Sequence, residues 1–240
     1  MPTAVEVYND GGGLQFSSYA QLPVVAAKGT HSSATNYIAA GLAGWGTTRL
    51  DIACNEQAVV AIRPNGGGYF GVSYVEYVSG TRRIVYFCNG NAQSFDWWLF
   101  EHPNTVAAAN AGFEIYADDG SLTWQLGQLP LRPASIMQMA INAGSLGDQS
   151  VIVPGGRNWA IVQGMRSGRR YFQNVPEPDG QPLRYSPRLA MDCARISGST
   201  LTMGMVQVES TVVYYTDPAV YNTNTYFGPR NAIVVDVTNY

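Results

Sequence analysis

The sequence predicts an all-β protein made of two tandem, related antiparallel β-sandwich domains. Short runs of alternating apolar and polar residues recur along the 240-residue chain, in which Gly, Tyr, Val, Asn and Thr are prominent. Clusters of Gly, Asn, Asp and Pro separate these runs and mark turns. One hairpin-like stretch near the start occurs again in the second half of the chain. Many short strands favour sandwiches, and the recurrence favours an internal duplication.

The recurring stretch covers residues 5–16, and its second copy covers residues 113–124. Each copy has an alternating strand, a turn rich in Asp, Asn and Gly, and a second alternating strand, which is the pattern of a β-hairpin. We expect the hairpin strands at residues 4–9 and 14–18, and again at residues 113–117 and 122–126. The turn residues of the two copies are Asn9, Asp10 and Gly11, and Asp118, Asp119 and Gly120. Such residues suit the positive φ angles that hairpin turns require.

Further correspondences follow in the same order along the chain. The segment Gln21-Leu22-Pro23-Val24 after the first hairpin is matched by Gln128-Leu129-Pro130-Leu131 after the second. Later matches are Val60-Ala61-Ile62 with Trp159-Ala160-Ile161, Tyr69-Phe70 with Tyr171-Phe172, and residues 83–88 with residues 188–193. All fall at offsets of about 100 residues. We therefore predict a duplication, with one domain at residues 1–108 and the other at residues 109–240.

The first domain contains further alternating runs after its hairpin. We expect strands at residues 49–53, 58–63, 69–78, 82–88 and 95–101. Residues 29–46 are small, polar and dotted with glycine, which indicates either a long surface loop or strands with short side chains.

The second domain repeats this plan with longer excursions. We expect strands at residues 135–142, 150–153, 159–163, 171–174, 189–196, 200–215 (with a bend) and 232–237. Pro176, Pro178, Pro182 and Pro187 cannot donate to a central β-ladder, so we expect residues 175–187 to form a surface loop. No segment of the chain has the 3.6-residue apolar stripe of a helix.

The charge distribution argues against several classes of partner. The formal net charge is −3, so we expect no nucleic acid and no anionic membrane as a partner. The exception is a local group formed by Arg157, Arg166, Arg169 and Arg170, which indicates either a solvated face or a surface that pairs with an acidic partner subunit. No window has the apolar length of a membrane span, so we expect no membrane insertion.

The cysteines and the first residues indicate where the protein folds. Cys54, Cys88 and Cys193 are odd in number and widely spaced, which favours buried, reduced thiols. If Cys88 and Cys193 are equivalent in the repeat, they should occupy the same core position in their two domains. The start of the sequence lacks the charged and apolar regions of a signal peptide. Together these features favour folding in a reducing cytoplasm.

Catalytic and metal-binding motifs do not occur in the sequence. The two histidines, His31 and His102, have no metal partner at a recognisable spacing, and there is no nucleophile elbow or phosphate-binding loop. Asp118-Asp119-Gly120 indicates a turn, because a Ca²⁺ site needs six or more oxygens from a longer motif. We therefore predict a protein that is not an enzyme and that uses no metal or cofactor.

Aromatic residues supply the candidate contact sites. Trp97 and Trp98 are adjacent in an expected strand, so their side chains should point to opposite faces of the sheet. Aromatic residues also gather near the end of the sequence, at Tyr214, Tyr215, Tyr221, Tyr226 and Phe227. Exposed aromatic side chains serve as anchors of protein interfaces or stack on sugar rings, whereas buried ones pack cores and domain contacts.

Residues 5–24 carry a resemblance to a known group of proteins. An apolar strand ending in Val7-Tyr8, an Asn-Asp-Gly turn, Leu14-Gln15-Phe16 and the Leu22-Pro23 exit together resemble the β-rich minor tail proteins of long-tailed bacteriophages. Residues 113–133 echo the same pattern. Phe16-Ser17-Ser18 keeps the family's usual sequence after the turn, whereas Trp124-Gln125-Leu126 departs from it.

The resemblance implies a structural virion protein of the tail tip or baseplate. Such a protein would assemble in the host cytoplasm, become part of the virion tail, and contact other tail proteins of the tail tip, baseplate or central fibre. It would act through protein-protein contacts in assembly or host attachment, and edge pairing in a homo-oligomer is physically reasonable. The alternative is a carbohydrate-binding β-sandwich that recognises a glycan on the host cell surface.

Overall fold

The structure is a computed structural model that describes residues 6–8, 14–17, 22–32, 46–66, 68–88, 94–107, 112–117, 119–139, 148–163, 168–175, 184–210, 213–214, 225–227 and 230–240. These residues form an almost entirely β structure, in which the one helical element is a short 3₁₀ turn, η1 (Pro103–Thr105). The all-β class expected from the sequence is confirmed.

The first half of the chain contributes strands β1 to β8. They are β1 (Glu6–Tyr8), β2 (Leu14–Ser17), β3 (Val24–Ser32), β4 (Gly46–Ala53), β5 (Val59–Pro64), β6 (Phe70–Val78), β7 (Thr81–Cys88) and β8 (Ser94–Glu101). The second half contributes β9 (Glu114–Tyr116), β10 (Leu122–Gln125), β11 (Pro133–Met139), β12 (Gln149–Ile152), β13 (Trp159–Val162), β14 (Gly168–Val175), β15 (Arg184–Ser197), β16 (Thr200–Ser210), β17 (Val213–Tyr214), β18 (Thr225–Phe227) and β19 (Arg230–Asp236).

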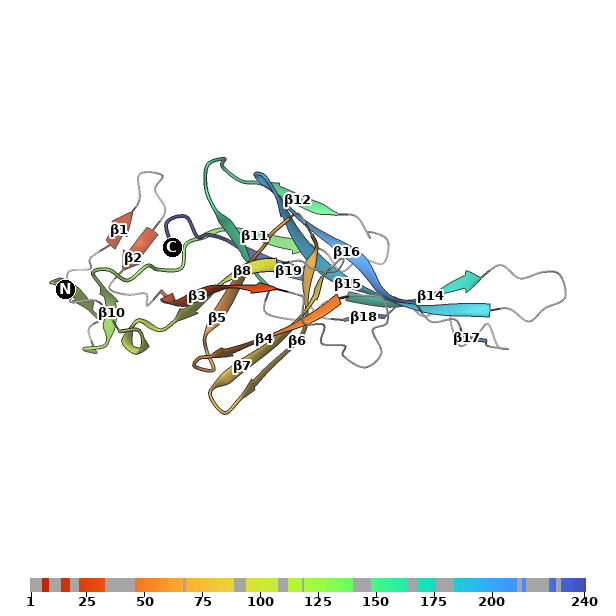
Figure 1. The fold of residues 1–240 in the computed structure, drawn as a ribbon. Helices are drawn as coiled ribbons and strands as arrows, with labels where there is room; N and C mark the ends of the chain where they lie inside the picture. Colours follow the sequence, from red (N-terminus) through yellow and green to blue (C-terminus); the bar gives the residue numbers. More distant parts are fainter. Residues whose placement is uncertain are drawn as a thin grey trace.

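Two large antiparallel sheets make up the body of the molecule (Figure 1). The six-stranded sheet has the order β11-β19-β13-β5-β8-β3. The nine-stranded sheet has the order β12-β16-β15-β6-β7-β4, with β14 and β17 also paired with β15, and β18 paired with β14. Each sheet therefore takes three strands of its main path from the first half of the chain and three from the second.

The core lies between the two sheets and forms two clusters. The first-half cluster contains Leu50, Ile52, Ala58, Val60, Ile62, Phe70, Val72, Ile84, Phe95 and Leu99. The second-half cluster contains Met137, Val153, Trp159, Ile161, Ala194, Ile196, Leu201, Met203, Ala232 and Val234. Phe70 of β6 and Phe95 of β8 are fully buried and meet edge to face with their ring centroids 5.2 Å apart, so they join the two sheets. Burial of each such large apolar side chain contributes about 1.5–3 kcal/mol.

A third cluster covers the opposite face of the six-stranded sheet. Its buried members are Ala61, Trp98, Phe100, Ala160, Val235 and Val237. Alternation along a strand assigns neighbouring residues to the two faces, so Leu99 enters the core between the sheets while Trp98 and Phe100 enter this third cluster. Both faces are buried here, which explains why the central strands are apolar almost without interruption.

Among the described residues, backbone pairing joins the two halves at three antiparallel contacts. In the six-stranded sheet Ile62 of β5 lies opposite Ile161 of β13. In the nine-stranded sheet Phe70 of β6 lies opposite Ala194 of β15. The third contact joins the segments that follow the two hairpins. There the amide of Val25 donates to the carbonyl of Leu129 (2.9 Å), and the amide of Leu131 donates to the carbonyl of Pro23 (2.7 Å).

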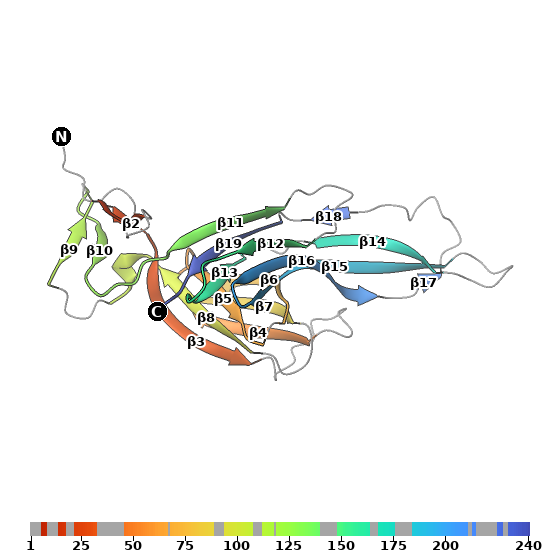
Figure 2. The same cartoon turned by 90° about the horizontal axis from the view of Figure 1, so that it is seen from above.

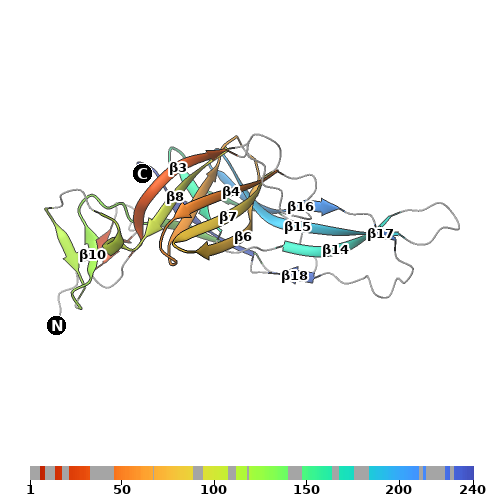
Figure 3. The same cartoon turned by 60° about the horizontal axis from the view of Figure 1, so that its bottom comes forward.

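Smaller elements project from both ends of the sandwich (Figures 2 and 3). The hairpins β1–β2 and β9–β10 form separate two-stranded sheets at one end. At the other end β14, the first part of β15 and β17 extend beyond the sandwich, and we call these strands the arm. The hairpins and the arm therefore lie at opposite ends of an elongated molecule.

The predicted hairpins are confirmed, and several other strands differ from the expectations. Both hairpins form antiparallel pairs, β1 with β2 and β9 with β10. No strand was expected at residues 24–28, yet β3 begins at Val24 because it pairs with β8 along the sheet edge. The strand expected at residues 200–215, with a bend, is described as β16 and β17, and the residues between them lie outside the described residues.

Pro187 is a further correction, because it lies within β15 instead of in a loop. Its register partner is Phe172 of β14, and the ladder between β15 and β16 begins only at Arg188. On its other side β15 pairs with β16 at Arg188 and with β17 at Tyr185, and the segment between β16 and β17 lies outside the described residues. The proposed division of the chain at residue 108 stays a prediction.

Candidate interaction surface

The β9–β10 hairpin presents a group of large apolar side chains to solvent. They are Phe113 (53% exposed), Tyr116 (52%), Leu126 (52%) and Leu129 (39%). We call these four residues the hairpin patch. Phe113 also packs on Trp124, with ring centroids 6.4 Å apart in an edge-to-face arrangement. Strand alternation places Phe113 on the face of Ile115 and Trp124, and Tyr116 on the opposite face with Glu114 and Gln125, so both faces of this projecting hairpin expose apolar side chains.

The turn of this hairpin follows from its Asp-Gly sequence. The amide of Gly120 donates to the carbonyl of Ala117 (2.9 Å), and Gly120 has φ 81°, which a residue without Cβ adopts at no steric cost. The Asp119 carboxylate accepts hydrogen bonds from the amide (2.9 Å) and the hydroxyl (2.6 Å) of Ser121. These bonds lower the pKa of Asp119 below its usual value, so this carboxylate is charged at neutral pH.

The base of the hairpin is anchored by Gln128, which is 6% exposed. Its side-chain amide donates to the carbonyls of Pro103 (3.0 Å) and Val106 (3.3 Å), and its side-chain oxygen accepts from the amide of Gln125 (3.1 Å). The indole of Trp124 donates to the carbonyl of Gln128 (3.2 Å). One buried side chain thus ties β10 to the η1 turn, which holds the patch in place before any partner binds.

Acidic and polar groups lie beside the patch. The Tyr116 hydroxyl donates to the Glu114 carboxylate, and the Gln125 side chain donates to the other oxygen of the same carboxylate (3.0 Å). The hydrogen bond to Glu114 raises the pKa of the Tyr116 hydroxyl. Residues 103–131 contain Glu114, Asp118 and Asp119 but no Lys or Arg. Tyr116, Glu114 and Gln125 therefore share one face of the hairpin, and that face is polar and acidic.

The tryptophans singled out in the sequence lie on opposite faces of the six-stranded sheet. Trp97 packs partly buried against the first-half core, where its ring covers Gly29 so closely that an added Cβ would lie 2.8 Å from its Cζ2 atom. Trp98 belongs to the third cluster and is 8% exposed. The structure thus places most of both indoles against the sheet.

The other candidate residues of the sequence analysis fall in or near the arm. Tyr214 lies in β17 opposite Arg184, and Tyr226 lies in β18 opposite Arg169. Phe227 lies opposite Gly168. Tyr215 and Tyr221 lie outside the described residues, as do the turn residues Asn9, Asp10, Gly11 and Asp118. Their role in contacts stays a prediction.

Sequence reasoning did not select the four residues of the hairpin patch as contact residues. The available signal was the departure of the second hairpin from the family pattern, where Leu126 follows Trp124-Gln125 in place of the Ser-Ser of the first copy. Exposure could not be deduced from it, because an alternating hairpin does not show which face the rest of the chain covers.

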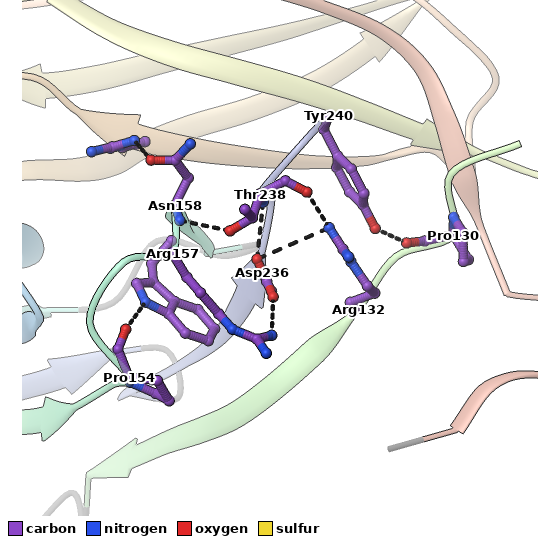
Figure 4. A network of polar contacts seen from close by, with 10 residues as sticks. Pro130, Arg132, Pro154, Arg157, Asn158, Asp236, Thr238 and Tyr240 are labelled. Carbon is purple, nitrogen blue, oxygen red and sulfur yellow. Dashed lines mark hydrogen bonds and ion pairs between the residues drawn. The ribbon is translucent and has the colours of Figure 1, made fainter. Parts of the chain in front are cut away.

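The densest polar network joins the end of β19 to the neighbouring segments (Figure 4). Asp236 is 4% exposed and pairs with Arg157 at 2.6 Å and with Arg132 at 4.0 Å. Burial opposes its ionisation, but hydrogen bonds from Thr238 and Arg157 prevail and lower the pKa of Asp236. The carbonyl of Thr238 in turn accepts from Arg132 (2.5 Å). The Asp236 carboxylate is held by Arg157, Arg132 and Thr238 together, so we interpret this network as structural.

Tyr240 closes the same network from the other side. Its ring lies under the Arg132 guanidinium, 4.3 Å from the ring centroid, and edge to face with Phe100 at 6.1 Å. Its hydroxyl donates to the carbonyl of Pro130, and Lys28 donates to its carbonyl oxygen at 2.7 Å. Burial raises the pKa of Tyr240 to about 12. The contacts attach residues 237–240 to the third cluster.

The described ranges contain neither a candidate metal site nor a helix that could span a membrane. No group of three or more His, Cys, Asp or Glu side chains there could hold a metal ion. None of the helical segments in that part of the chain is long and apolar enough to cross a membrane.

Comparison with protein-family models, with curated proteins and with solved structures found no match for this chain. The functional argument therefore depends on its own residues.

Proposed function

We propose that this chain is a structural assembly protein that acts through protein-protein contacts and that the hairpin patch is one of its contact surfaces. The observation that carries the proposal is the exposure of Phe113, Tyr116, Leu126 and Leu129 on one projecting, anchored hairpin. Exposed aromatic and aliphatic side chains that gather on one projecting element are typical of protein contact surfaces. The proposal assigns the chain no catalytic role and no cofactor.

We place this assembly role in the tail tip or baseplate of a long-tailed bacteriophage. Support comes from the resemblance carried by residues 5–24 and 113–133, and from an all-β body with projecting elements at both ends. In this proposal the protein is part of the virion tail, and its partners are neighbouring tail proteins. Rigid β-sandwiches with projecting hairpins suit such a role, because contact surfaces are held apart on a stiff support.

The proposal includes an internal duplication. The strand order of the first half, β5-β8-β3 in one sheet and β6-β7-β4 in the other, corresponds to β13-β19-β11 and β15-β16-β12 in the second half. When the additional strands β14, β17 and β18 are left out, corresponding strands occupy the same position in the chain order of each half. Unrelated halves would have no reason to share this order in both sheets.

The hairpins support the duplication at the level of single residues. In β1–β2, Glu6 pairs with Ser17, Val7 with Phe16 and Tyr8 with Leu14. In β9–β10, Glu114 pairs with Gln125, Ile115 with Trp124 and Tyr116 with Leu122. Each residue of the first set corresponds to one 108 positions later, as Glu6 does to Glu114. The bulge also falls at the same place, since Gln15 and Thr123 are the residues left unpaired.

Two of the contacts between the halves have the form of a local twofold axis. Ile62 and Ile161, which the sequence alignment makes equivalent, lie opposite each other. In the segments after the hairpins, Leu131 bonds to Pro23, and Val24 forms a bridge with Pro130. In the two exits Pro23 corresponds to Pro130, and Val24 corresponds to Leu131. Replacing both residues of one pair by their counterparts therefore gives the other pair. An antiparallel pair of equivalent segments is what joining two like units about a dyad would produce.

The strand order favours a different alignment for two later sequence matches. Cys88 lies in β7, whose counterpart by sheet position is β16, whereas Cys193 lies in β15. Tyr171-Phe172 lies in the additional strand β14, whereas the counterpart of Phe70 in β6 lies in β15. We therefore withdraw these two matches from the argument for duplication. The matches at the hairpins, their exits and Ile62 are kept.

The test of the proposed function is localisation in purified particles. Mass spectrometry of virions from the source system should detect the chain, and antibody label should lie at the tail end in electron micrographs. A chain with Phe113→Ser and Tyr116→Ser should lose incorporation, because the patch anchors are removed. Ile152→Ser is the matched control, since Ile152 is 82% exposed on β12, away from the hairpin. Absence of the wild-type chain from particles would contradict the proposal.

One observation favours carbohydrate binding as the second candidate. Tyr116 is an exposed aromatic ring beside Glu114 and Gln125, whose polar groups suit sugar hydroxyls. A glycan array on the purified protein would show selective binding that Tyr116→Ala abolishes. Absence of binding on the array, with incorporation into particles, would leave the assembly role alone.

A further inference from the structure

The edge of the six-stranded sheet at β11 is open. Among the described residues β11 pairs with β19 alone, and Ile136 in the middle of β11 is 68% exposed. Proteins protect such edges with charged side chains, especially lysine, with proline or with bulges. Residues 133–139 contain no charged residue. The proline and the bulge of β11 both lie at its start, so residues 136–139 have none of these protections.

One residue from each of the six strands lies in a single row across this sheet. From β11 to β3 the row is Ile136, Ile233, Val162, Ala61, Trp98 and Lys28. The step from Val162 to Ala61 continues the antiparallel register of Ile161 with Ile62. Residues directly opposite each other point to the same face. The row therefore ends in isoleucine at one edge and in Lys28, the only lysine of the chain, at the other.

Ile136 also extends a larger apolar surface. Its neighbours in the row, Ile233 and Val162, are partly buried and pack against the third cluster. Ile152 on β12 is different, because its register partner is Thr200 and the nearest residue of β12 on its own face is Ser150. Ile152 is therefore a single exposed apolar residue, which is ordinary on a protein surface.

Main-chain groups of β11 face the open edge. In β19, the amide of Asp236 donates to a carbonyl oxygen of the segment that leads into β11 (3.0 Å). Because the direction of hydrogen bonding alternates along an antiparallel strand, Ala232 also bonds towards β11, where its partner is Met137. The amides and carbonyls on either side of Met137, those of Ile136 and Gln138, therefore point away from β19.

We propose that β11 of one copy of this chain pairs antiparallel with β11 of a second copy, with Ile136 opposite Ile136 about a twofold axis. The contact repeats the joint within the chain, where the equivalent residues Ile62 and Ile161 lie opposite each other. Since β11 carries no charge, no like-charge repulsion opposes the pairing of two identical strands.

The inference adds a second contact surface to the proposed assembly function, separate from the hairpin patch. It rests on that proposal in one respect, because the internal duplication makes Ile62 equivalent to Ile161 and the β3 edge equivalent to the β11 edge.

Lys28 distinguishes this twofold contact from a head-to-tail one. Pairing of β11 with β3 of another copy would use the edge that carries Lys28, whose ammonium already donates to the carbonyl oxygen of Tyr240 (2.7 Å). A lysine on an edge strand opposes the addition of another strand. Pairing of β11 with β11 uses both open edges and leaves none, so the assembly closes as a dimer.

The experiment measures self-association of the full chain by sedimentation velocity. The wild-type protein should change reversibly from monomer to dimer as its concentration rises, with nothing larger. Ile136→Lys puts two like charges opposite each other across the axis, so association should weaken by at least about tenfold. Ile152→Lys makes the same change at an 82% exposed position on β12 and should associate like the wild type. Circular dichroism melting verifies that each variant is folded.

A cysteine at position 136 tests the register. Opposite residues of a hydrogen-bonded antiparallel pair have Cα atoms about 5.5 Å apart, within the range of roughly 4.4–6.8 Å found in disulfides. Ile136→Cys should therefore form a disulfide-linked dimer on mild oxidation. The wild type and Ile152→Cys, which keep the native cysteines, should form no such dimer.

Three results would overturn the inference. The first is a wild-type chain that stays monomeric at all concentrations, and its detection in virions would still support the assembly function. The second is an Ile136→Lys variant that associates as tightly as the wild type, and the third is equal cross-linking of Ile136→Cys and Ile152→Cys. Dimers that form as expected from a chain absent from virions would support the inference and contradict the proposed function.

Discussion

Ile62 of β5 lies directly opposite Ile161 of β13, and this pair joins the two halves of the chain within the six-stranded sheet. The two side chains are 4% and 1% exposed, and each belongs to the core cluster of its own half. Residues opposite each other in an antiparallel pair point to the same face, so the two clusters adjoin at these isoleucines.

Replacing these isoleucines by alanine should therefore destabilise the fold, and the effect of each substitution should depend on the other. Ile62→Ala and Ile161→Ala should each lower the free energy of unfolding by about 2–5 kcal/mol, since each removes buried volume. The double variant should differ from the sum by about 0.5–3 kcal/mol, as contacting residues do. Urea unfolding measures all three values. Ile152→Ala, at an 82% exposed position, should change stability by less than about 0.5 kcal/mol. Full additivity at the join would show that the halves are energetically independent there.

Gly71 in β6 is a second point where the two halves of the chain are in close contact. A Cβ added there would lie 2.5 Å from the carbonyl oxygen of Asp192 and 2.7 Å from the sulfur of Cys193. Because the first of these atoms is backbone, we expect Gly71→Ala to cost about 1–3 kcal/mol in thermal or urea unfolding. Gly155→Ala is the matched control, since a Cβ there meets nothing within 4 Å. Equal stability of both variants would show that β6 and β15 separate without cost.

Ionisation of the Tyr240 hydroxyl should make the stability of the fold depend on pH in the alkaline range. Burial raises its pKa from 10.0 to about 12 in the folded protein. The unfolded chain therefore ionises first, so the contribution of Tyr240 is complete below pH 10 and is lost as pH rises towards 12. The loss should approach about 2–3 kcal/mol. Urea unfolding at pH 9 and pH 11 should detect about half of it, about 1.4 kcal/mol. Tyr240→Phe should be less stable at pH 9 but should decline less between these values, and an equal decline would contradict the assignment.

Gln128 should control the order of the hairpin patch without controlling the fold. Its side chain makes three hydrogen bonds at the base of β9–β10, and none of them belongs to the two large sheets. We expect Gln128→Ala to increase amide hydrogen exchange at residues 113–126 by about tenfold, which corresponds to about 1.4 kcal/mol of local stability. Exchange in β5 and β13 should stay unchanged. Gln125→Ala, which loses only the side-chain bond to Glu114, should have a smaller effect.

The hairpins were predictable from sequence because their information is local. An Asp-Gly turn between two alternating strands specifies which residues pair, and β9–β10 has the expected pairing. The opposite faces of Trp97 and Trp98 followed from strand alternation in the same way. The hairpin patch was not predictable, because exposure of Phe113 and Tyr116 depends on which face η1 and Gln128 cover.

Pro187 and β3 show where local reasoning fails. Pro187 cannot donate a ladder hydrogen bond, yet β15 continues through it because the residues before and after it pair with β14. Residues 24–28 were not recognised as a strand from the sequence. They form an edge strand because they pair with β8, which lies far along the chain.

By itself the sequence determined the all-β class, the two hairpins with their turns, and the low, uneven charge of the protein, because these depend on neighbouring residues and on composition. Only the tertiary structure decided that both sheets contain strands of both halves, that Ile62 meets Ile161, and that the hairpins lie opposite the arm. Those features depend on pairings between distant segments, whose register is set by burial of whole faces and by loop closure.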